Sequence, residues 1–206
     1  MNGFTFTLDP YVIEPERKGA GAARVGRRGI VGPFGEVAVE YVEPVPGPGG
    51  EHRSSSEVRG DAVPLVRFTG RVLGGPPSLD GGRLTVDGAP VSLAFNARGL
   101  TNEARALHLG YAGRDLTYTS QGLHKGGELR GEGIRIVLEP GAAVRIGRAR
   151  QKATVGSAEG PVDAVAVALA VLFEEVDTYL LTLGGAAAAA PFRALGRLFP
   201  PGGAGA

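Results

Sequence analysis

The sequence contains no cysteine, and its 206 residues include three histidines and one methionine. Without cysteine the chain cannot form disulfide bonds, thiolate metal sites or a cysteine nucleophile. Its net charge is +1, so no overall field draws it toward nucleic acid or a membrane. The first residues, MNGFTFTLDPYVIEPERK, lack the basic head and long apolar run of a secretory signal. We therefore expect a cytoplasmic protein, with membrane association left open.

Lysine is also scarce, since Lys18, Lys125 and Lys152 are the only ones and arginine supplies the other cations. Together with abundant alanine and glycine, this bias is typical of a protein from a GC-rich bacterial genome. The glycines and prolines mostly separate short β-prone runs, which indicates turns.

Apolar and polar residues alternate through most of the chain, a pattern typical of half-buried β-strands. The alternation begins over residues 3–13 and 34–43 and returns from residue 63. The later runs are 63–73, 82–88, 89–99, 106–113, 114–122, 128–141 and 142–156. Short glycine or proline turns separate them, and Asp87-Gly88 is a strong hairpin signal. About nine strands joined in this way predict an antiparallel meander that closes into a barrel or sandwich.

Two segments lack a clear apolar pattern. Residues 15–29 carry five cations, and we interpret them as a mobile loop or the edge of a strand. Residues 44–61 contain PVPGPGG followed by polar residues, which predicts a flexible loop inside the β-rich domain.

A helix is predicted after the strands, within PVDAVAVALAVLFEEVDTYLLT at residues 161–182. Pro161 suits a first helical position, and Asp163 favours the first turn. Residues 164–173 are uninterruptedly apolar, and acidic residues follow on one side until Gly184 and Gly185. A strand would also alternate here, but about 20 residues without a turn signal favour a helix.

The apolar part of this helix is too short to cross a bilayer, because ten residues span only about 15 Å. A helix that is apolar on every side must be buried on every side. The rest of the chain offers little except strands to surround it. We therefore expect a mainly β protein, an antiparallel barrel or strongly curled sheet enclosing a C-terminal hydrophobic helix. Residues 1–185 would form one domain, and 186–206 an amphipathic segment with a disordered tail.

Many antiparallel strands followed by a nearly all-apolar helix, here DAVAVALAVLFEEVD, resemble the tubby C-terminal-like superfamily. This group includes tubby domains, phospholipid scramblases and the LURP-one-related proteins. The resemblance covers residues 63–183 and implies a twelve-stranded β-barrel around a central helix. It also implies binding to membrane phosphoinositides, although no lipid-contacting or metal-binding motif of the family can be matched to residues here.

Two basic segments are candidate sites for an anionic ligand. Arg17, Lys18, Arg24, Arg27 and Arg28 form the first, and Arg148, Arg150 and Lys152 the second. Phosphate-rich partners such as lipid headgroups would suit them. Nucleic acid is disfavoured because no aromatic stacking residue lies among the cations of the first segment.

The simpler interpretation of both segments is structural. The first would be a solvated loop, and the second the outward side of a barrel strand. The alternative is that the two segments combine into one anion site.

The C-terminal residues also form a candidate contact surface. Phe192, Leu195 and Phe199 recur at helical spacing with Arg193 and Arg197 beside them. This predicts a short amphipathic helix that contacts a membrane, a partner or the protein's own barrel.

Catalytic and metal-binding patterns are weak. His124-Lys-Gly-Gly-Glu128 has part of a cupin metal spacing, but Gly122 stands where a second histidine is needed. No GxSxG elbow occurs, and GAGAARVG does not lie between a strand and a helix as a dinucleotide loop does. His52 lies in the predicted loop. We expect neither a resident metal nor a cofactor.

Three function hypotheses follow. The first is a non-catalytic binding or scaffold protein that contacts an anionic membrane surface or a protein partner. The second is a structural subunit that self-assembles as a homo-oligomer. The third is an enzyme with a site at the barrel mouth, for which His108, His124 and Glu128 are the candidates.

Overall fold

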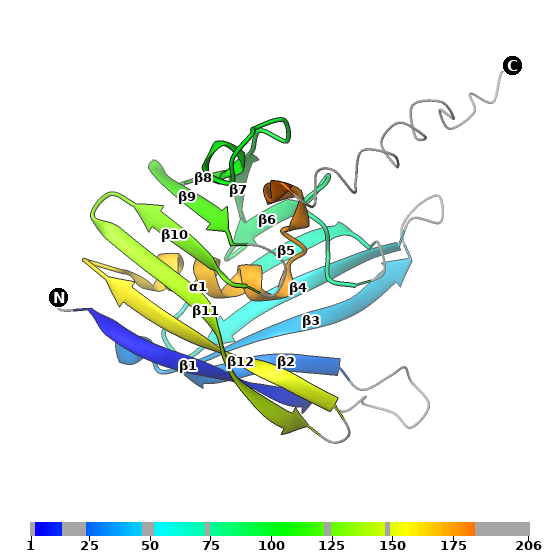
Figure 1. Ribbon diagram of the computed structural model, residues 1–206, viewed down its shortest axis with the longest axis vertical. Helices are drawn as coiled ribbons and strands as arrows, with labels where there is room; N and C mark the ends of the chain where they lie inside the picture. Colours follow the sequence, from blue (N-terminus) through cyan, green and yellow to red (C-terminus); the bar gives the residue numbers. More distant parts are fainter. Residues whose placement is uncertain are drawn as a thin grey trace, which may run out of the picture.

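A computed structural model describes residues 3–13, 24–46, 52–72, 75–121, 125–146 and 149–183. Twelve antiparallel strands close into a barrel, in which each strand pairs with its neighbours in sequence and β1 pairs with β12 (Figure 1). The strands are β1 Phe4–Ile13, β2 Arg24–Ile30, β3 Glu36–Pro46, β4 His52–Gly60, β5 Val66–Arg71, β6 Arg83–Val86, β7 Ala89–Ala94, β8 Leu107–Tyr111, β9 Arg114–Ser120, β10 Gly127–Gly131, β11 Ile134–Ile146 and β12 Ala149–Glu159. The predicted mainly β fold is confirmed.

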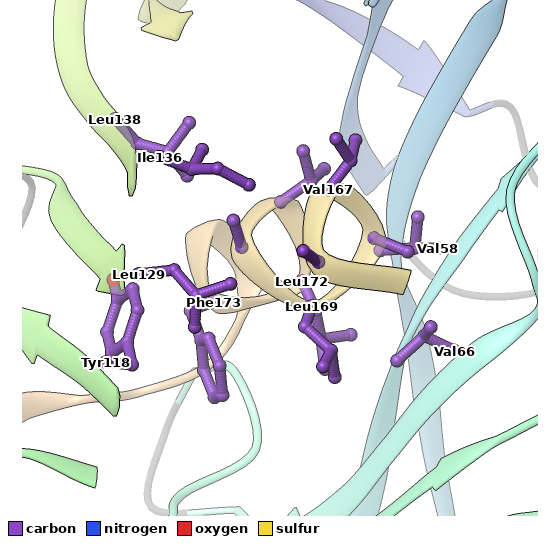
Figure 2. Packing of buried hydrophobic residues seen from close by; sticks show 14 of the residues in the cluster. Val58, Val66, Tyr118, Leu129, Ile136, Leu138, Val167, Leu169, Leu172 and Phe173 are labelled. Atoms are coloured by element: carbon purple, nitrogen blue, oxygen red, sulfur yellow. The ribbon is translucent and has the colours of Figure 1, made fainter. Parts of the chain in front are cut away.

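The helix α1, Ala164–Leu172, lies inside this barrel and contacts the walls formed by β3, β4, β5, β10 and β11 (Figure 1). Every residue from Ala166 to Leu172 is buried. Its side chains pack against inward residues such as Val58, Val66 and Ile136, all of which are fully buried (Figure 2). The helix is rich in alanine and valine, so the strands can approach it closely. The predicted enclosure of an apolar helix by sheet is confirmed.

The sequence explains where α1 begins and where it ends. Asp163 is the N-cap, and its side chain accepts a hydrogen bond from the Ala166 backbone N–H at 2.8 Å. At the other end a 3₁₀ turn, Phe173–Glu175, follows directly, and Val176 is extended. The prediction of about 20 helical residues is therefore too long. The helix stops where the apolar run stops, because Glu174 and Glu175 find polar partners on the barrel wall.

Two strand predictions are also wrong. Residues 52–60 form β4 rather than a loop, and its inward side chains near the end of α1 are Ser54 and Ser56. These small polar residues hide the apolar alternation on which the prediction depended. The predicted break at residues 139–143 is instead a bulge between Pro140 and Ala143, and β11 continues through it.

The two ends of the barrel carry different connections. Where α1 begins, an end that we call the turn mouth, strands are joined by segments 31–35, 61–65, 87–88, 112–113 and 132–133. Where α1 ends, which we call the loop mouth, the intervening segments are 14–23, 47–51, 72–82, 95–106, 121–126 and 147–148. The longest connections thus gather at the loop mouth, and loops on a rigid scaffold are common places for binding sites.

A short strap, residues 176–182, crosses the loop mouth after the helix. The Asp177 backbone N–H donates to the Pro77 carbonyl at 3.0 Å, and Asp177 forms a parallel bridge with Ser78. Buried Arg105 donates to the Leu180 carbonyl at 3.4 Å. These contacts fix the chain over the barrel interior. No helix in the described part of the chain is long and apolar enough to span a membrane.

Candidate functional site

A cavity of about 620 Å³ opens at the loop mouth, between the end of α1, the strap and strand β12. Its described lining combines charged, hydroxyl-bearing and aromatic side chains with small apolar residues. The lining residues are Arg27, Gly75, Pro76, Tyr118, Gly126, Pro140, Arg150, Gln151, Lys152, Ala153, Thr154, Phe173, Glu174, Val176, Asp177, Thr178 and Tyr179. A concave surface of this size with a few polar groups is typical of small-ligand sites.

Cations from both basic segments of the sequence line this one cavity. Arg27 comes from β2, and Arg150 and Lys152 come from β12. Arg150 and Lys152 precede Thr154, whose side chain is buried, by four and two residues on this strand. Both side chains are exposed to solvent, and Gln151 and Ala153 of the same strand line the cavity beside them.

Arg27 is held by an ion pair with Glu175, in which only 15% and 11% of the two side chains are exposed. Burial lowers the pKa of Arg27, and the negative charge of Glu174 partly opposes that shift. The Nε atom of Arg27 is buried and has no hydrogen-bond partner among the described residues. Ser56 donates to the Glu175 carbonyl, which ties the same turn to β4.

Two carboxylates stand beside the cations. Glu174 accepts a hydrogen bond from the Thr154 hydroxyl at 2.5 Å, which anchors it to β12. Asp177 accepts one from the Tyr179 backbone N–H at 2.9 Å, which shapes the strap. The hydroxyls of Ser120 and Thr178 lie 3.2 Å apart and link the strap to β9.

An aromatic pair forms the apolar part of the cavity. Tyr118 and Phe173 stack with ring centroids 4.4 Å apart, and both are buried (Figure 2). Burial raises the pKa of the Tyr118 hydroxyl, and the charge of Glu174 raises it further. Tyr118 is therefore neutral at physiological pH, and the field of Glu174 reaches the floor of the cavity.

The other members of the basic segments lie elsewhere. Arg28 is exposed on the outer wall, where its guanidinium lies 4.8 Å from the centre of the Tyr11 ring. Arg24 belongs to β2, but its side chain lies outside the described residues, as do Arg17, Lys18 and Arg148. The predicted amphipathic segment with Phe192, Arg193, Leu195, Arg197 and Phe199 also lies outside them.

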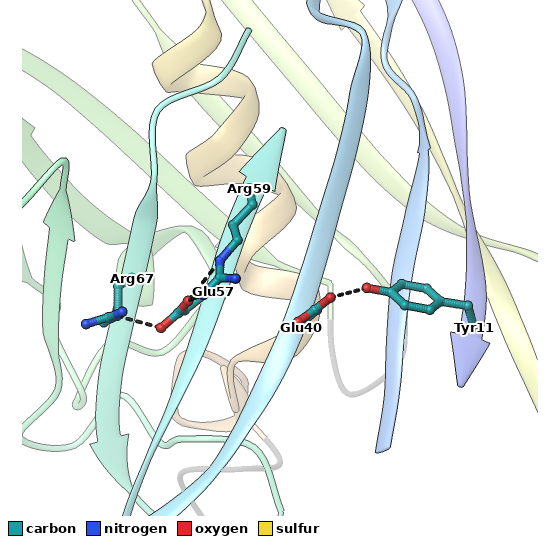
Figure 3. A network of polar contacts seen from close by, with 5 residues as sticks. All are labelled: Tyr11, Glu40, Glu57, Arg59 and Arg67. Carbon is teal, nitrogen blue, oxygen red and sulfur yellow. Dashed lines mark hydrogen bonds and ion pairs between the residues drawn. The ribbon is translucent and has the colours of Figure 1, made fainter. Parts of the chain in front are cut away.

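The outer wall carries two groups of polar contacts, one of which surrounds the buried carboxylate Glu57. Tyr11 donates to Glu40, and Glu57 pairs with Arg59 and with Arg67, the latter at 2.6 Å (Figure 3). Glu57 is buried beneath the two arginines. The Arg59 side chain is more than half exposed, and the Arg67 side chain is half exposed. These contacts join β1 to β3 and β4 to β5, and they give both Glu40 and Glu57 a partner.

Of the three residues named for a possible enzyme, the structure describes His108 and Glu128. His52 and His108 are exposed, and His124 lies outside the described residues. Glu128 pairs with Arg130 at 2.8 Å and with Arg135 at 2.5 Å. Burial opposes the shift, yet hydrogen bonds and charge from these arginines lower the pKa of Glu128. No group of three potential metal ligands occurs among the residues that the structure describes.

Several cavity residues were missed in the sequence. The sequence pattern predicts that Glu174 and Asp177 form the solvent-exposed end of a longer helix. It predicts that Tyr118 and Thr154 are strand residues without a special role. The end of the apolar run at Phe173 was the available signal, because a helix that stops inside a barrel leaves its first polar residues at the mouth.

Comparisons of the chain with protein-family models, with curated proteins and with solved structures gave no significant match.

Proposed function

We propose that this chain is a non-catalytic binding protein that contacts an anionic partner with its loop mouth. The observation that carries the proposal is the meeting of Arg27, Arg150 and Lys152 at one cavity. Within the described residues Arg150 and Lys152 form no ion pair. Two exposed cations that line one cavity and have no ion-pair partner among the described residues favour a ligand with several negatively charged oxygens.

The resemblance to the tubby C-terminal-like superfamily supports a lipid headgroup as that partner. A closed barrel of twelve antiparallel strands around a helix that follows them is the fold which the resemblance implies. Under this proposal the anionic surface is the cytoplasmic face of a membrane. Under the same proposal, the cations Arg17, Lys18, Arg24 and Arg148 would extend the contact.

A flotation experiment tests this proposal. Vesicles of phosphatidylcholine with 20% phosphatidylglycerol should carry the protein at low salt and release it as salt rises, because surface charge attraction is screened. The charge reversals Arg150→Glu and Lys152→Glu together should abolish the association. Vesicles of phosphatidylcholine alone, whose net charge is zero, should carry less protein than the anionic vesicles.

The matched control is the double variant Arg59→Glu, Arg130→Glu. It changes the net charge equally, and both side chains are 63% exposed on the outer wall. Each partner carboxylate keeps a second arginine, Arg67 or Arg135. If the control loses binding as fully as the mouth variant does, the effect is one of net charge. The proposal of a site at the loop mouth then fails.

A further inference from the structure

The loop-mouth cavity contains negative as well as positive side chains. Among its described lining residues, Arg27, Arg150 and Lys152 are cations, and Glu174 and Asp177 are carboxylates. Arg27 is already neutralised by Glu175. Two cations and two carboxylates remain, so the part of the lining that can receive a ligand is balanced in charge.

A purely anionic ligand would use only the positive half of the charged groups in this lining. It would be attracted by Arg150 and Lys152 but repelled by Glu174 and Asp177, and in a partly buried site such repulsion is only weakly screened. A ligand that also carries a positive group would be attracted by the two carboxylates and would therefore bind more tightly.

We propose that the cavity binds a phosphate-bearing zwitterion, with its phosphate on Arg150 and Lys152 and its ammonium group on Glu174 and Asp177. The phosphate half rests on the proposed function; the ammonium half goes beyond it. The ligand is a small phosphoamine, either free or as the headgroup of a lipid.

The geometry of β12 sets the two charges at a short separation. Arg150, Lys152 and Thr154 occupy alternate positions of β12 and all line the cavity, at steps of about 7 Å for two residues. Thr154 holds Glu174 through its hydroxyl at 2.5 Å. The Glu174 carboxylate is therefore anchored one step from Lys152, a spacing that suits a phosphate and an ammonium joined by a short linker.

Aromatic groups add to the ammonium side. Tyr179 lines the cavity from the strap, and the Tyr118–Phe173 stack lies beneath. Aromatic faces attract cations and exclude water, which strengthens the pull of nearby carboxylates. Burial raises the pKa of the Tyr118 hydroxyl most, and the nearby charge of Glu174 raises it further.

Calorimetric titration of the whole chain with three soluble probes tests the inference. Phosphoethanolamine carries both groups, whereas inorganic phosphate and ethanolamine carry one each. Phosphoethanolamine should bind at least tenfold more tightly than either single-charge probe. Equal binding of phosphate and phosphoethanolamine, or no binding of phosphoethanolamine in free or lipid form, overturns the inference.

Two double variants, each of which replaces charged side chains with uncharged ones, test which residues bind the phosphate and which bind the ammonium group. Glu174→Gln with Asp177→Asn keeps oxygen acceptors for Thr154 and Tyr179, so the fold should persist. This variant should lose the tenfold preference while still binding phosphate. Arg150→Gln with Lys152→Gln should lose both phosphate and phosphoethanolamine, and a preference that survives the carboxylate change contradicts the assignment.

Vesicles separate the two sources of the ligand. If the headgroup is bound, adding phosphatidylethanolamine to phosphatidylcholine vesicles should increase flotation, and Glu174→Gln with Asp177→Asn should remove that increase. If the free phosphoamine is bound, the soluble titration alone responds. Binding to phosphatidylglycerol vesicles that is unaffected by the carboxylate variant leaves the proposed function standing and removes the zwitterion.

Discussion

At the residue scale, the ion pair between Arg27 and Glu175 joins β2 to the turn that ends α1. Both side chains are largely withdrawn from solvent, so each charge depends on the other. Breaking a buried pair by removing one charge is costly, whereas replacing both members by apolar residues of similar size can be nearly neutral.

We therefore expect Glu175→Gln to lower the free energy of unfolding by about 3 kcal/mol. The double variant Arg27→Met, Glu175→Met should recover most of this loss, because no unpaired charge remains. Urea unfolding of the unchanged protein, Glu175→Gln and the double variant measures both values. If the double variant is as unstable as the single one, packing rather than charge is what the pair supplies.

The sequence identified the cations of the site but not their neighbours. Arg27, Arg150 and Lys152 stood out as members of two basic segments. Glu174 and Asp177 did not, because their position depends on where α1 stops inside the barrel. A strand residue such as Thr154 gives no sign in sequence that it will meet a carboxylate from another element.

At the element scale, the β6–β7 hairpin shows local sequence and structure in agreement. Asp87 and Gly88 both have positive φ, at 48° and 82°, as the favoured two-residue hairpin turn requires. Asp87 also accepts a hydrogen bond from the Leu65 backbone N–H at 2.9 Å. The dipeptide alone was enough to predict this turn.

Gly88→Ala should destabilise the protein by about 1 kcal/mol, since a Cβ disfavours the left-handed backbone conformation. Open space surrounds the position, so crowding does not contribute. Gly75→Ala is the matched control, because that site is equally open and its φ is not positive. Thermal unfolding compares the two, and equal midpoints would contradict the backbone explanation.

The elements that the sequence missed share one physical property. β4 and the bulged part of β11 lie where the barrel wall passes beyond the apolar core, toward the loop mouth. There, β4 has Ser54 and Ser56 at its inward positions, and the bulge of β11 contains Pro140 and Gly141. The apolar alternation therefore fails in both strands, although their backbone hydrogen bonding continues. The alternation of apolar and polar residues arises where a strand packs against an apolar core. It is therefore absent where the strand extends past that core.

At the scale of the whole molecule, α1 fills the barrel that surrounds it. Leu169 is fully buried among residues of the central cluster (Figure 2). Leu169→Ala should cost about 2–5 kcal/mol, the sum of lost burial and the cavity left behind. Leu100→Ala, at a side chain that is 85% exposed, should change stability by less than about 0.5 kcal/mol.

Denaturant titration of both variants decides this prediction. A loss at Leu169 no larger than that at Leu100 would mean that the centre of the barrel is loosely filled. The central position of α1 would then contribute little to stability.

Closure also limits how copies of the chain can associate. Among the described strands, each has a partner on both sides, so none offers an open edge for strand addition. Self-assembly, if it occurs, must use side-chain surfaces. A light-scattering mass above that of the monomer would establish it.

The position of α1 after all twelve strands has a consequence for biosynthesis. A ribosome adds about 5–20 residues per second, so roughly ten seconds or more pass before the segment that fills the barrel is made. During that interval the strands, with their apolar inner faces, have been synthesised, but the helix α1 that covers those faces has not. A nascent chain of this protein should therefore depend on chaperones until the residues beyond Gly160 have left the exit tunnel.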